Sequence, residues 1–527
     1  MNTAKPADIN EHTFIDLFCG CGGFSIGLET INFKCLAGVD FNAPALESFR
    51  LNHSHNTKAL QRDLSKYTPE ELAEELGVTH VDVIVGGPPC QGFSTARQYS
   101  GTNSGGRLVP DARRELYQDF LRFIAFFRPK AFVMENVLGM RSSQNGKYFS
   151  AIQNEARMIG YRVVATEVNA WEHGAPQQRR RQLFIGTQAK LPIFSATELI
   201  KKTHGLPESG EDLEPLVTLG EAIGDLPALE AGSGEQTQQY DHEARRNHLQ
   251  RYSGRFLFGV VNADKCTELT WHCARKHIER DLRDFAKIRE GESCRMTLAR
   301  GEEMEFPYNR DTFKDRYKRQ GRNELCSTIV AHLKNDGLHF IHPTQNRSLT
   351  PREAARIQTF PDTFMFAGTR SNVYTQVGNA VPPVVGRAIG KSLQRYFHAL
   401  NGEVDKSNPR LDEQQRSKLL AELEDFVNRS NFRLMEQVPG DEFSKIWKSI
   451  HRLLPEVHPE SSNDHGMEIS PIPSRDTSFC IAPYYIRSGW PVELAKIAAE
   501  ARRRHSCGQL SSDEYLHRHC STERAQI

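Results

Sequence analysis

The stretch 13–29, TFIDLFCGCGGFSIGLE, predicts how the first part of the chain folds. Its first six residues form a short β-rich run, which stops at the closely spaced Gly20, Gly22 and Gly23 ahead of a helical sequence. A strand that ends in glycines before a helix lets the backbone approach a ligand and directs the N–H groups of the first helical turn towards it. Alone this is a weak signal, because such turns bind dinucleotides, adenosyl ligands or no ligand at all.

The same alternation of short apolar runs and helical sequences continues along the chain. Strands are expected at 35–40 (CLAGVD), 81–87 (VDVIVGG), 130–136 (KAFVMEN) and 181–187 (RQLFIGT). Helical sequences lie between some of them, as in LYQDFLRFIAFF (116–127). Strands that alternate with helices across glycine turns indicate βαβ units. We therefore expect an α/β fold with a mostly parallel sheet.

The pattern breaks down over residues 188–346, which are polar and irregular. Within them, TIVAHLKNDGLHFIHP (328–343) is expected to be rich in strands. Regular structure resumes at 348–360, where Thr350, Pro351 and Glu353 have the spacing of a helix cap with a capping box. An amphipathic helix is expected to end near residue 400. Beyond it the composition changes again, to charged helical and linker-like sequence.

Composition limits the classes of protein that the chain can represent. It has 527 residues, 25% of them charged and 38% hydrophobic, which fits two or three globular domains. Lys and Arg total 67 against 66 Asp and Glu, so the net charge is only +1 and the chain is no polycation. A surface for nucleic acid must therefore come from local clusters. The basic run KDRYKRQGR (314–322) is one such cluster, and we expect it to contact phosphates.

Targeting and cysteine usage favour an intracellular protein. The first residues contain no signal-peptide pattern, and no apolar run reaches the roughly 18 residues of a membrane span. The 11 cysteines include no CxxC pair and no recurring zinc spacing. We expect free thiols in a reducing compartment, no bound metal and no contact with a membrane.

One cysteine has unusual neighbours. Cys90 stands in GGPPCQGFS (86–94), just past a predicted strand and after two prolines. An isolated cysteine is more often a small buried hydrophobe, but this position exposes the thiol at the carboxyl edge of the sheet, where α/β proteins bind their ligands. A free thiol has a pKa of about 8.5, and helix starts or nearby arginines raise its thiolate fraction. Cys90 is therefore a candidate nucleophile.

Other polar residues follow the ends of the expected strands. Asp40 can bind a pair of ribose hydroxyls, and Phe41 can stack on an adenine. Asp63 can reach a purine edge or can simply be a solvated turn residue. Glu135 closes an apolar strand, where a charge is costly unless it is used or paired.

A basic sequence, PQQRRRQLF (176–184), begins the last of these strands. Alternation places Arg179 and Arg181 on one face and Arg180 on the other, which suits two guanidinium groups directed into a cleft. The alternative is a solvated basic edge.

Together these blocks resemble the cytosine-5 DNA methyltransferase family, of the bacterial modification type. The resemblance is carried by the glycine turn, PPC (88–90), ENV (135–137), Q-x-R-x-R (177–181), RSLTPREAARIQTFPD (347–362) and QVGNAVPP (376–383). It covers roughly residues 12–187 and 347–400, and the blocks occur in the family's order. It implies a Rossmann-like fold that binds S-adenosyl-L-methionine as methyl donor.

The resemblance also assigns roles to individual residues. It implies catalysis by Cys90, Glu135, Arg179, Arg181 and Gln177, with Cys90 attacking C6 of a cytosine and Glu135 at its N3. The cofactor would be held by Phe18, Gly20, Gly22, Asp40, Phe41, Asp63, Leu64, Pro88, Asn379 and Ala380. Since a base inside a duplex cannot reach the nucleophile, the target would be flipped out.

The same resemblance divides the chain into regions. Residues 12–187 and 347–400 would form the catalytic domain, and residues 188–346 would form an inserted target recognition domain. Residues 94–111 would close over the base, and 401–527 would be an extension of unknown role. The expected partner is double-stranded DNA, with a restriction endonuclease acting separately, and the enzyme would be a monomer in the bacterial cytoplasm.

Three alternatives remain open at this point. A cytosine-5 tRNA methyltransferase uses the same scaffold, but the long insert argues against it. A nucleotide-dependent oxidoreductase would use the glycine turn and has no use for PPC, ENV and the paired arginines. An inactive DNA-binding regulator would not need Cys90 and Glu135.

Overall fold

The computed structural model describes residues 12–89, 115–191, 200–206, 213–306 and 316–400. Cys90, the expected closing segment 94–111 and the extension 401–527 lie outside these residues. No helix within the described ranges is long and apolar enough to cross a membrane.

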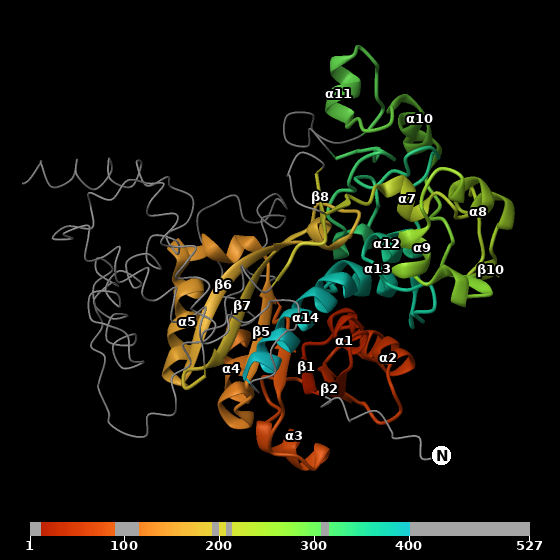
Figure 1. The fold of residues 1–527 in the computed structure, drawn as a ribbon. Helices are drawn as coiled ribbons and strands as arrows, with labels where there is room; N and C mark the ends of the chain where they lie inside the picture. The colour runs from red at the N-terminus through yellow and green to blue at the C-terminus, as the bar shows by residue number, and fades with distance from the viewer. Residues whose placement is uncertain (1–11, 90–114, 192–199, 207–212, 307–315, 401–527) are drawn as a thin grey trace, which may run out of the picture. The chain divides into compact units, whose positions relative to one another are not determined.

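A seven-stranded sheet is the centre of the fold (Figure 1), with strands in the order β3-β2-β1-β4-β5-β7-β6. The strands are β1 (His12–Leu17), β2 (Phe33–Asp40), β3 (Lys58–Gln61), β4 (Val83–Gly86), β5 (Ala131–Asn136), β6 (Tyr161–Asn169) and β7 (Arg180–Gln188). Pairings from β3 through to β5 are parallel, whereas β7 runs antiparallel to both β5 and β6. The expected α/β fold with a mostly parallel sheet is confirmed.

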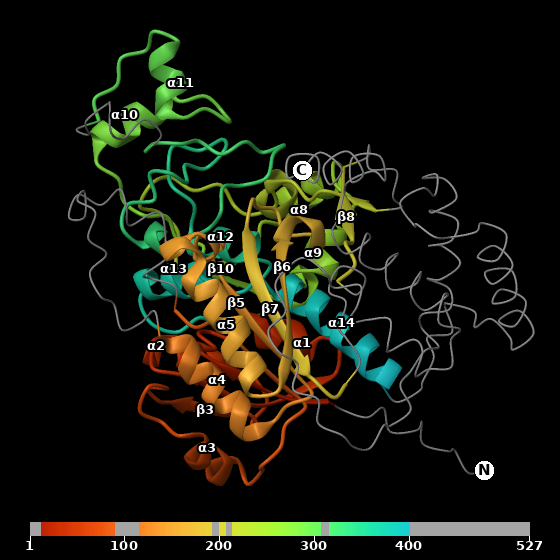
Figure 2. The same ribbon diagram turned by 90° about the vertical axis from the view of Figure 1, so that its left-hand side faces the viewer.

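Helices cover both faces of this sheet, as Figures 1 and 2 show. One face packs against α1 (Gly23–Glu29), α2 (Ala43–Asn52) and α14 (Pro383–Leu400), and the other against α3 (Pro69–Leu76), α4 (Leu116–Phe127) and α5 (Lys147–Met158). Alternation along β1 sets this division, because Phe14 belongs to the first core and Ile15 and Leu17 to the second. The strand β4 is buried throughout, as a central parallel strand must be.

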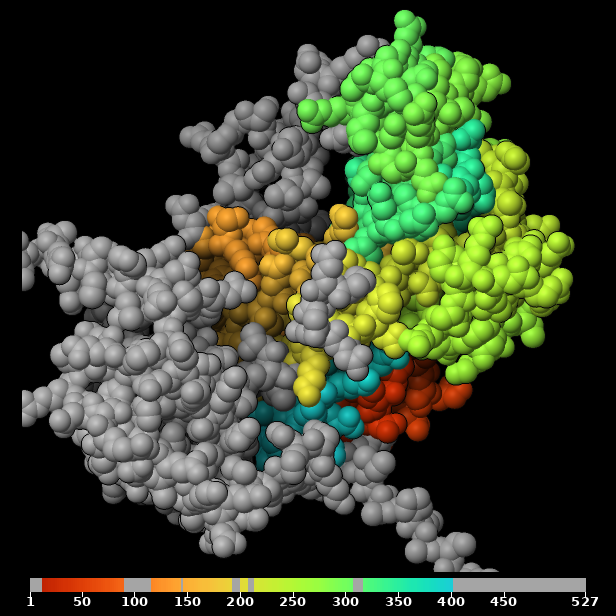
Figure 3. All heavy atoms as spheres, turned by 45° about the horizontal axis from the view of Figure 1, so that its top comes forward, coloured from red at the N-terminus to blue at the C-terminus, as the bar shows by residue number. Residues whose placement is uncertain are grey.

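The rest of the described chain has little strand. It contains β8 (His204–Gly205), β9 (Glu214–Pro215), α7 (Leu219–Ile223), β10 (Thr237–Gln239), α8 (His242–Leu249), α9 (Arg255–Gly259), β11 (Glu268–Thr270), α10 (Glu279–Lys287) and α11 (Cys294–Ala299), followed by α12 (Pro351–Ile357) and α13 (Arg370–Asn379). In the space-filling view of Figure 3 the yellow-green and green parts of this region adjoin each other. One hydrophobic core contains side chains of α7, α9, β11, α12 and α13.

The helix α12 begins as its sequence predicts. The Thr350 hydroxyl accepts from the N–H of Glu353, and the Glu353 carboxylate accepts from the N–H of Thr350, which completes a capping box. Glu353 also accepts from Arg347 at 2.7 and 2.8 Å. Burial raises the pKa of this carboxyl, but the Arg347 guanidinium outweighs burial and holds the pKa well below its usual range. The cap is thus part of a buried ion pair.

The prediction that residues 328–343 are rich in strands is wrong. The structure has a short 3-10 helix there, Ala331–Lys334, and otherwise an irregular chain with two isolated bridges at Ile341. Its backbone bonds instead to other segments: Ile329 donates to the side-chain oxygen of Gln177 at 3.1 Å, and the carbonyl of Leu338 accepts from the N–H of Lys318 at 3.1 Å. Tertiary partners overrode the local β-propensity.

The described part of the basic run 314–322, residues 316–322, is not a uniformly exposed basic surface. Arg319 is 5% exposed and donates to five acceptors between Phe285 and Asn346. Arg316 pairs with Asp336, and Arg322 pairs with Glu290. The prediction is therefore wrong for the buried Arg319, whereas for Arg316 and Arg322, which are partly exposed, contact with phosphates stays a prediction.

Candidate active site

The order of the strands creates the crevice in which the candidate residues lie. From β1 the chain builds outward through β2 to β3, and it then returns to place β4 and β5 on the other side of β1. Ligands of open α/β sheets bind at such a switch point, outside the carboxyl ends of the strands. The glycine turn follows β1, Asp40 ends β2, residues 87–89 follow β4, and Glu135 is near the end of β5.

The glycine turn, residues 18–23, has the backbone of a ligand-binding loop. Phe18, Gly20 and Gly22 have φ angles of 59°, 55° and 92°, in the left-handed region. A Cβ added to Gly20 would meet no atom within 4 Å, so the space beside this residue is open. The strained conformation of Phe18 is typical of functional turns.

Asp40 and Phe41 border this open space. The Asp40 carboxylate accepts from the backbone N–H groups of Gly20 at 2.9 Å and Asn42 at 2.8 Å, which fixes it beside the glycine turn. Burial raises the pKa of Asp40, and these two donors oppose the shift. The Phe41 side chain is 64% exposed, which is unusual for an aromatic ring. The residues present therefore fit an adenosyl group.

A buried carboxyl group lies behind the glycine turn. Asp16 is 1% exposed and accepts from the Ser25 hydroxyl at 2.6 Å. Burial raises its pKa to about 7, although the Ser25 hydrogen bond opposes the shift. This pair joins the end of β1 to the first turns of α1.

Asp63 and Leu64 differ in exposure. The Asp63 carboxylate accepts from the hydroxyl of Ser65 at 2.7 Å, and this hydrogen bond lowers its pKa. Its side chain is 52% exposed and can accept from a ligand. Leu64 is buried in the core beneath, and its carbonyl accepts from Arg122 at 2.7 Å.

The segment that leads to Cys90 contacts the end of β5. A Cβ added to Gly87 would lie 3.3 Å from Oε2 of Glu135. The amide of Asn136 donates to the carbonyl of Pro88 at 3.3 Å. Cys90 is two residues beyond Pro88 and outside the described residues. Asn136 was not among the expected site residues, although its place beside Glu135 at the end of a buried strand was a signal for it.

Glu135 forms an ion pair with Arg181 across the paired strands β5 and β7. Nε of Arg181 lies 2.7 Å from Oε1 of Glu135, and the two side chains are only 15% and 12% exposed. Among the described residues Oε1 accepts no well-aligned hydrogen bond, so the contact is an ion pair by distance alone. Arg180 points to the opposite face and pairs with Glu167 at 3.0 Å, as the alternation predicts.

Arg179 and Gln177 join distant segments of the chain. Arg179 is 1% exposed and donates to the carbonyls of Ile329 at 2.9 Å and Ala380 at 2.8 Å. The Gln177 amide donates to the side chain of Gln358 at 2.6 Å and accepts from the N–H of Ile329. Gln358 was not predicted, because nothing in its sequence context distinguishes it from a helix-end glutamine. We call this set of contacts the joint.

Residues 376–383 return to the glycine turn, as expected. A Cβ added to Gly23 would lie 2.4 Å from the carbonyl of Val381 and 3.2 Å from Ala380. Asn379 is exposed beside them. These residues therefore lie against the glycine turn.

A small cavity lies between the catalytic candidates. Its volume is about 10 Å³, and it is lined by Glu135, Arg179 and Arg181 together with apolar residues such as Val168 and Val381. That volume holds about one water molecule, so a base can enter only after these side chains move. Among the described residues no group of His, Cys, Asp or Glu could hold a metal ion.

This geometry agrees with the result of a comparison with known families. The family described as C-5 cytosine-specific DNA methylase matches residues 12–395. The chain belongs to this family. This cytosine-specific DNA methyltransferase therefore has the catalytic fold that its α/β sheet and glycine turn indicate, and DNA cytosine methylation is its activity.

Curated relatives of the methyltransferase extend over most of its length. It is 34% identical over 404 residues to the type II methyltransferase M.DdeI of Desulfomicrobium norvegicum, covering 73% of this chain and 89% of that protein. It is 30% identical over 433 residues to the type II methyltransferase M.AgeI of Thalassovita gelatinovora, covering 72% and 98%.

A solved structure shares the methyltransferase fold. It is described as a DNA modification methyltransferase encoded within a prophage of E. coli. The TM-score is 0.57 at 25% sequence identity, over 73% of this chain and 99% of that one.

Proposed function

We propose that the enzyme transfers a methyl group from S-adenosyl-L-methionine to C5 of a cytosine flipped out of double-stranded DNA, through a covalent adduct with Cys90. The observation that carries this proposal is the contact between the segment leading to Cys90 and the end of β5. Gly87 lies against Glu135, and Pro88 is bonded to Asn136. A nucleophile and a proton donor on these two segments would act on the same base.

The cofactor would bind along the glycine turn. Gly20, Gly22 and Phe18 would approach it with their backbones, Asp40 would accept from the ribose hydroxyls, and Phe41 would stack on the adenine. Asp63 and Leu64 would border the purine, and Pro88, Asn379 and Ala380 would close the site. The bound cofactor supplies an electrophilic methyl group.

Cys90 would begin the reaction by adding its thiolate to C6 of the cytosine. The ring then becomes an enamine with electron density at C5, which can attack the methyl group. Glu135 would hold a proton at N3 and so drain charge from the ring during this addition. After methylation a base removes the C5 proton, and expulsion of the Cys90 thiolate restores the aromatic ring.

The paired arginines and Gln177 would orient the base. Arg181 can release Glu135 and bind the cytosine when the small cavity opens. Arg179 would direct its guanidinium towards O2, while its bonds to the carbonyls of Ile329 and Ala380 keep it in place. Gln177 would act through the joint, as a positioning residue.

The proposed domains follow the boundaries expected from the sequence. Residues 12–187 and 347–400 would be catalytic, and 188–346 would recognise the target. Residues 94–111 would close over the flipped base, which costs a few kcal/mol to extrude. The core that α12 and α13 share with α7 and β11 supports a tight connection between recognition and catalysis.

The biological setting is proposed from the relatives. Both are named as type II methyltransferases. We infer that this enzyme protects bacterial DNA from a separate restriction endonuclease, acting as a monomer in the cytoplasm.

A duplex that carries 5-fluorocytosine at the target position tests the covalent step. Attack at C6 and methylation at C5 can proceed, but fluorine then replaces the departing proton, so the enzyme stays bound. We expect an adduct that survives denaturing gels, requires S-adenosyl-L-methionine and is absent in Cys90→Ala. Cys35→Ala is the matched control, since Cys35 is buried and its pKa is raised far above the usual value by burial.

Two outcomes would overturn the proposal. An adduct that persists in Cys90→Ala would assign the nucleophile to another residue. Trapping on fluorinated tRNA and on no DNA would favour the RNA methyltransferase instead.

A further inference from the structure

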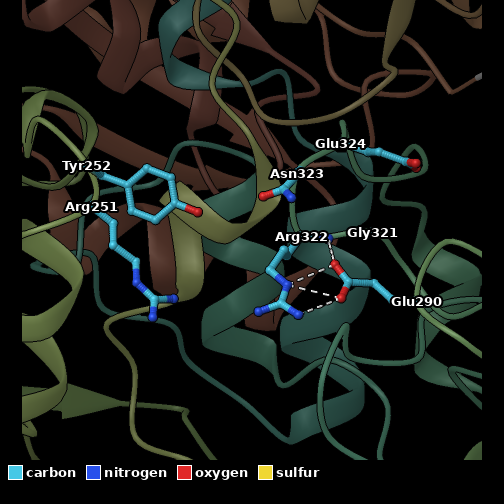
Figure 4. Close-up of a pocket in the computed structure, with 7 residues that line it drawn as sticks. All are labelled: Arg251, Tyr252, Glu290, Gly321, Arg322, Asn323 and Glu324. Carbon is cyan, nitrogen blue, oxygen red and sulfur yellow. Dashed lines mark hydrogen bonds and ion pairs between the residues drawn. The ribbon is translucent and has the colours of Figure 1, made fainter.

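An open groove of about 460 Å³ is formed by residues that lie between β7 and α12 in the sequence (Figure 4). Arg251 and Tyr252, which follow α8, form one wall. Asn323 and Glu324 form the other, beside the ion pair of Arg322 with Glu290. The groove contains none of the candidate catalytic or cofactor-binding residues and is therefore distinct from the candidate active site.

The side chains of the groove divide into fixed and available ones. The Arg322 guanidinium lies 3.1 and 3.0 Å from the two carboxylate oxygens of Glu290, and the backbone N–H of Arg322 donates to the same carboxylate at 2.7 Å. This pair fixes the wall. Arg251 and Glu324 are exposed, and within the described part of the chain neither side chain makes a hydrogen bond or an ion pair. They are available to a ligand.

The groove is connected to the candidate active site through Cys326 and through Ile329, which belongs to the joint. Two residues beyond Glu324, the N–H of Cys326 donates to Pro176 at 2.9 Å, and its carbonyl accepts from Gln178 at 2.8 Å. Ile329 then holds Arg179. Two residues of chain span at most about 7 Å. Glu324 is thus separated from the segment that carries Arg179 by two residues and one pair of backbone hydrogen bonds, so a duplex whose cytosine is bound at Arg179 would pass close to the groove.

The charges of the groove favour base edges over phosphates. Two arginines and two glutamates line it, so the groove has no excess positive charge to attract the DNA backbone. The two available charges have opposite sign. In the major groove an arginine donates to O6 and N7 of guanine, and a glutamate accepts from the N4 amino group of cytosine. A G·C pair presents both partners together.

We propose that this groove reads one G·C pair near the methylated cytosine, with Arg251 on the guanine and Glu324 on the cytosine amino group. The inference rests on the proposed function, because it needs double-stranded DNA in the crevice. Tyr252 lines the groove beside Arg251, and the Arg322–Glu290 pair fixes the opposite wall. Arg322, although basic and exposed, is a positioning residue.

The test measures methylation rates on a pool of duplexes with randomised positions around the cytosine. Arg251→Ala should reduce discrimination at one guanine by about 10- to 100-fold and leave the other positions unchanged. Glu324→Gln should reduce discrimination at the same base pair and at no other position, and the double variant should lose more discrimination there than either single variant. Arg246→Ala is the matched control, because Arg246 is an exposed arginine of α8 outside the groove.

The outcomes separate this inference from the proposed function. A uniform loss of rate on all sequences in Arg251→Ala, with a weaker salt dependence, would make Arg251 a phosphate contact and overturn the inference. Relaxation at an A·T pair in Asn323→Ala, with none in Arg251→Ala, would assign the reading to the amide. If the wild-type enzyme methylates no duplex at all, the proposed function itself fails.

Discussion

The α/β part of the molecule and the region from 213 to 345 use arginine in different ways. In the α/β part, Arg180 and Arg181 follow the alternation of a strand, one facing outward and one into the crevice. In the other region, Arg319 is buried and donates to five acceptors. A basic residue in a regular strand can thus be assigned to a face from sequence. In an irregular chain a basic residue can instead be buried, where it donates the hydrogen bonds that regular secondary structure would otherwise supply.

Glu135→Gln should have the largest effect, and it tests the α/β half of the comparison. We expect methyl transfer to fall by about 10²- to 10⁴-fold while DNA binding is retained, because the amide cannot exchange a proton at N3. Single-turnover rates and gel-shift affinities measure the two effects. Glu167→Gln is the control, since Glu167 pairs with Arg180 on the outward face and should lose little activity. Unimpaired turnover in Glu135→Gln would remove Glu135 from the mechanism.

Arg319→Met should lower the free energy of unfolding by about 3–5 kcal/mol, because it leaves several buried carbonyl groups without donors. Urea denaturation measures the loss. Arg283→Met removes an exposed arginine that pairs with Glu305, and it should cost far less stability, because water screens an exposed ion pair. Equal effects of the two substitutions would end the distinction between structural and surface arginines in this region.

Asp16→Asn should change how stability depends on pH. The pKa of Asp16 in the folded protein is raised to about 7, so folding is favoured when the carboxyl is protonated. This contribution is complete below the unfolded pKa near 4 and is lost as pH rises through 7. Urea denaturation should show that the variant gains about 2–3 kcal/mol relative to wild type between pH 5 and pH 8. Parallel pH profiles would contradict this assignment.

Phe41→Ala should have the smallest effect, and it compares exposed aromatic rings of the two regions. Loss of a stacked ring should weaken binding of S-adenosyl-L-methionine by about 3- to 10-fold, as measured by calorimetry. Phe258→Ala removes a ring that is 39% exposed on α9 and should not alter the affinity. Equal affinities for wild type and Phe41→Ala would exclude stacking on Phe41.

The sequence predicted the central strands of the sheet better than β6, the strand at its antiparallel end. The runs 81–87 and 130–136 appear as β4 and β5, because a buried strand needs a continuous apolar run that is visible locally. The strand β6 was not predicted: its central residues are only half-buried, so its sequence carries a weaker pattern. The position of β6 depends on pairing with β7.

In the candidate site, too, the sequence predicted residues that follow a local pattern and missed those that depend on distant partners. Asp40 and Glu135 were predicted, since each closes a strand and strand ends meet at one edge of a parallel sheet. The joint could not be predicted: Gln177 bonds to Gln358 and Ile329, which are 181 and 152 residues away. No local pattern contains such partners.

The sequence by itself determined the α/β sheet, the glycine turn and the residues at the strand ends, because hydrophobic periodicity and backbone permissiveness act over a few residues. Only the tertiary structure decided which arginines are buried, how Arg179 is held, and that Arg322 pairs with Glu290 while Arg251 stays available. Burial and pairing depend on segments brought together from far along the chain. A charged side chain acquires its role only when its surroundings remove it from water or leave it there.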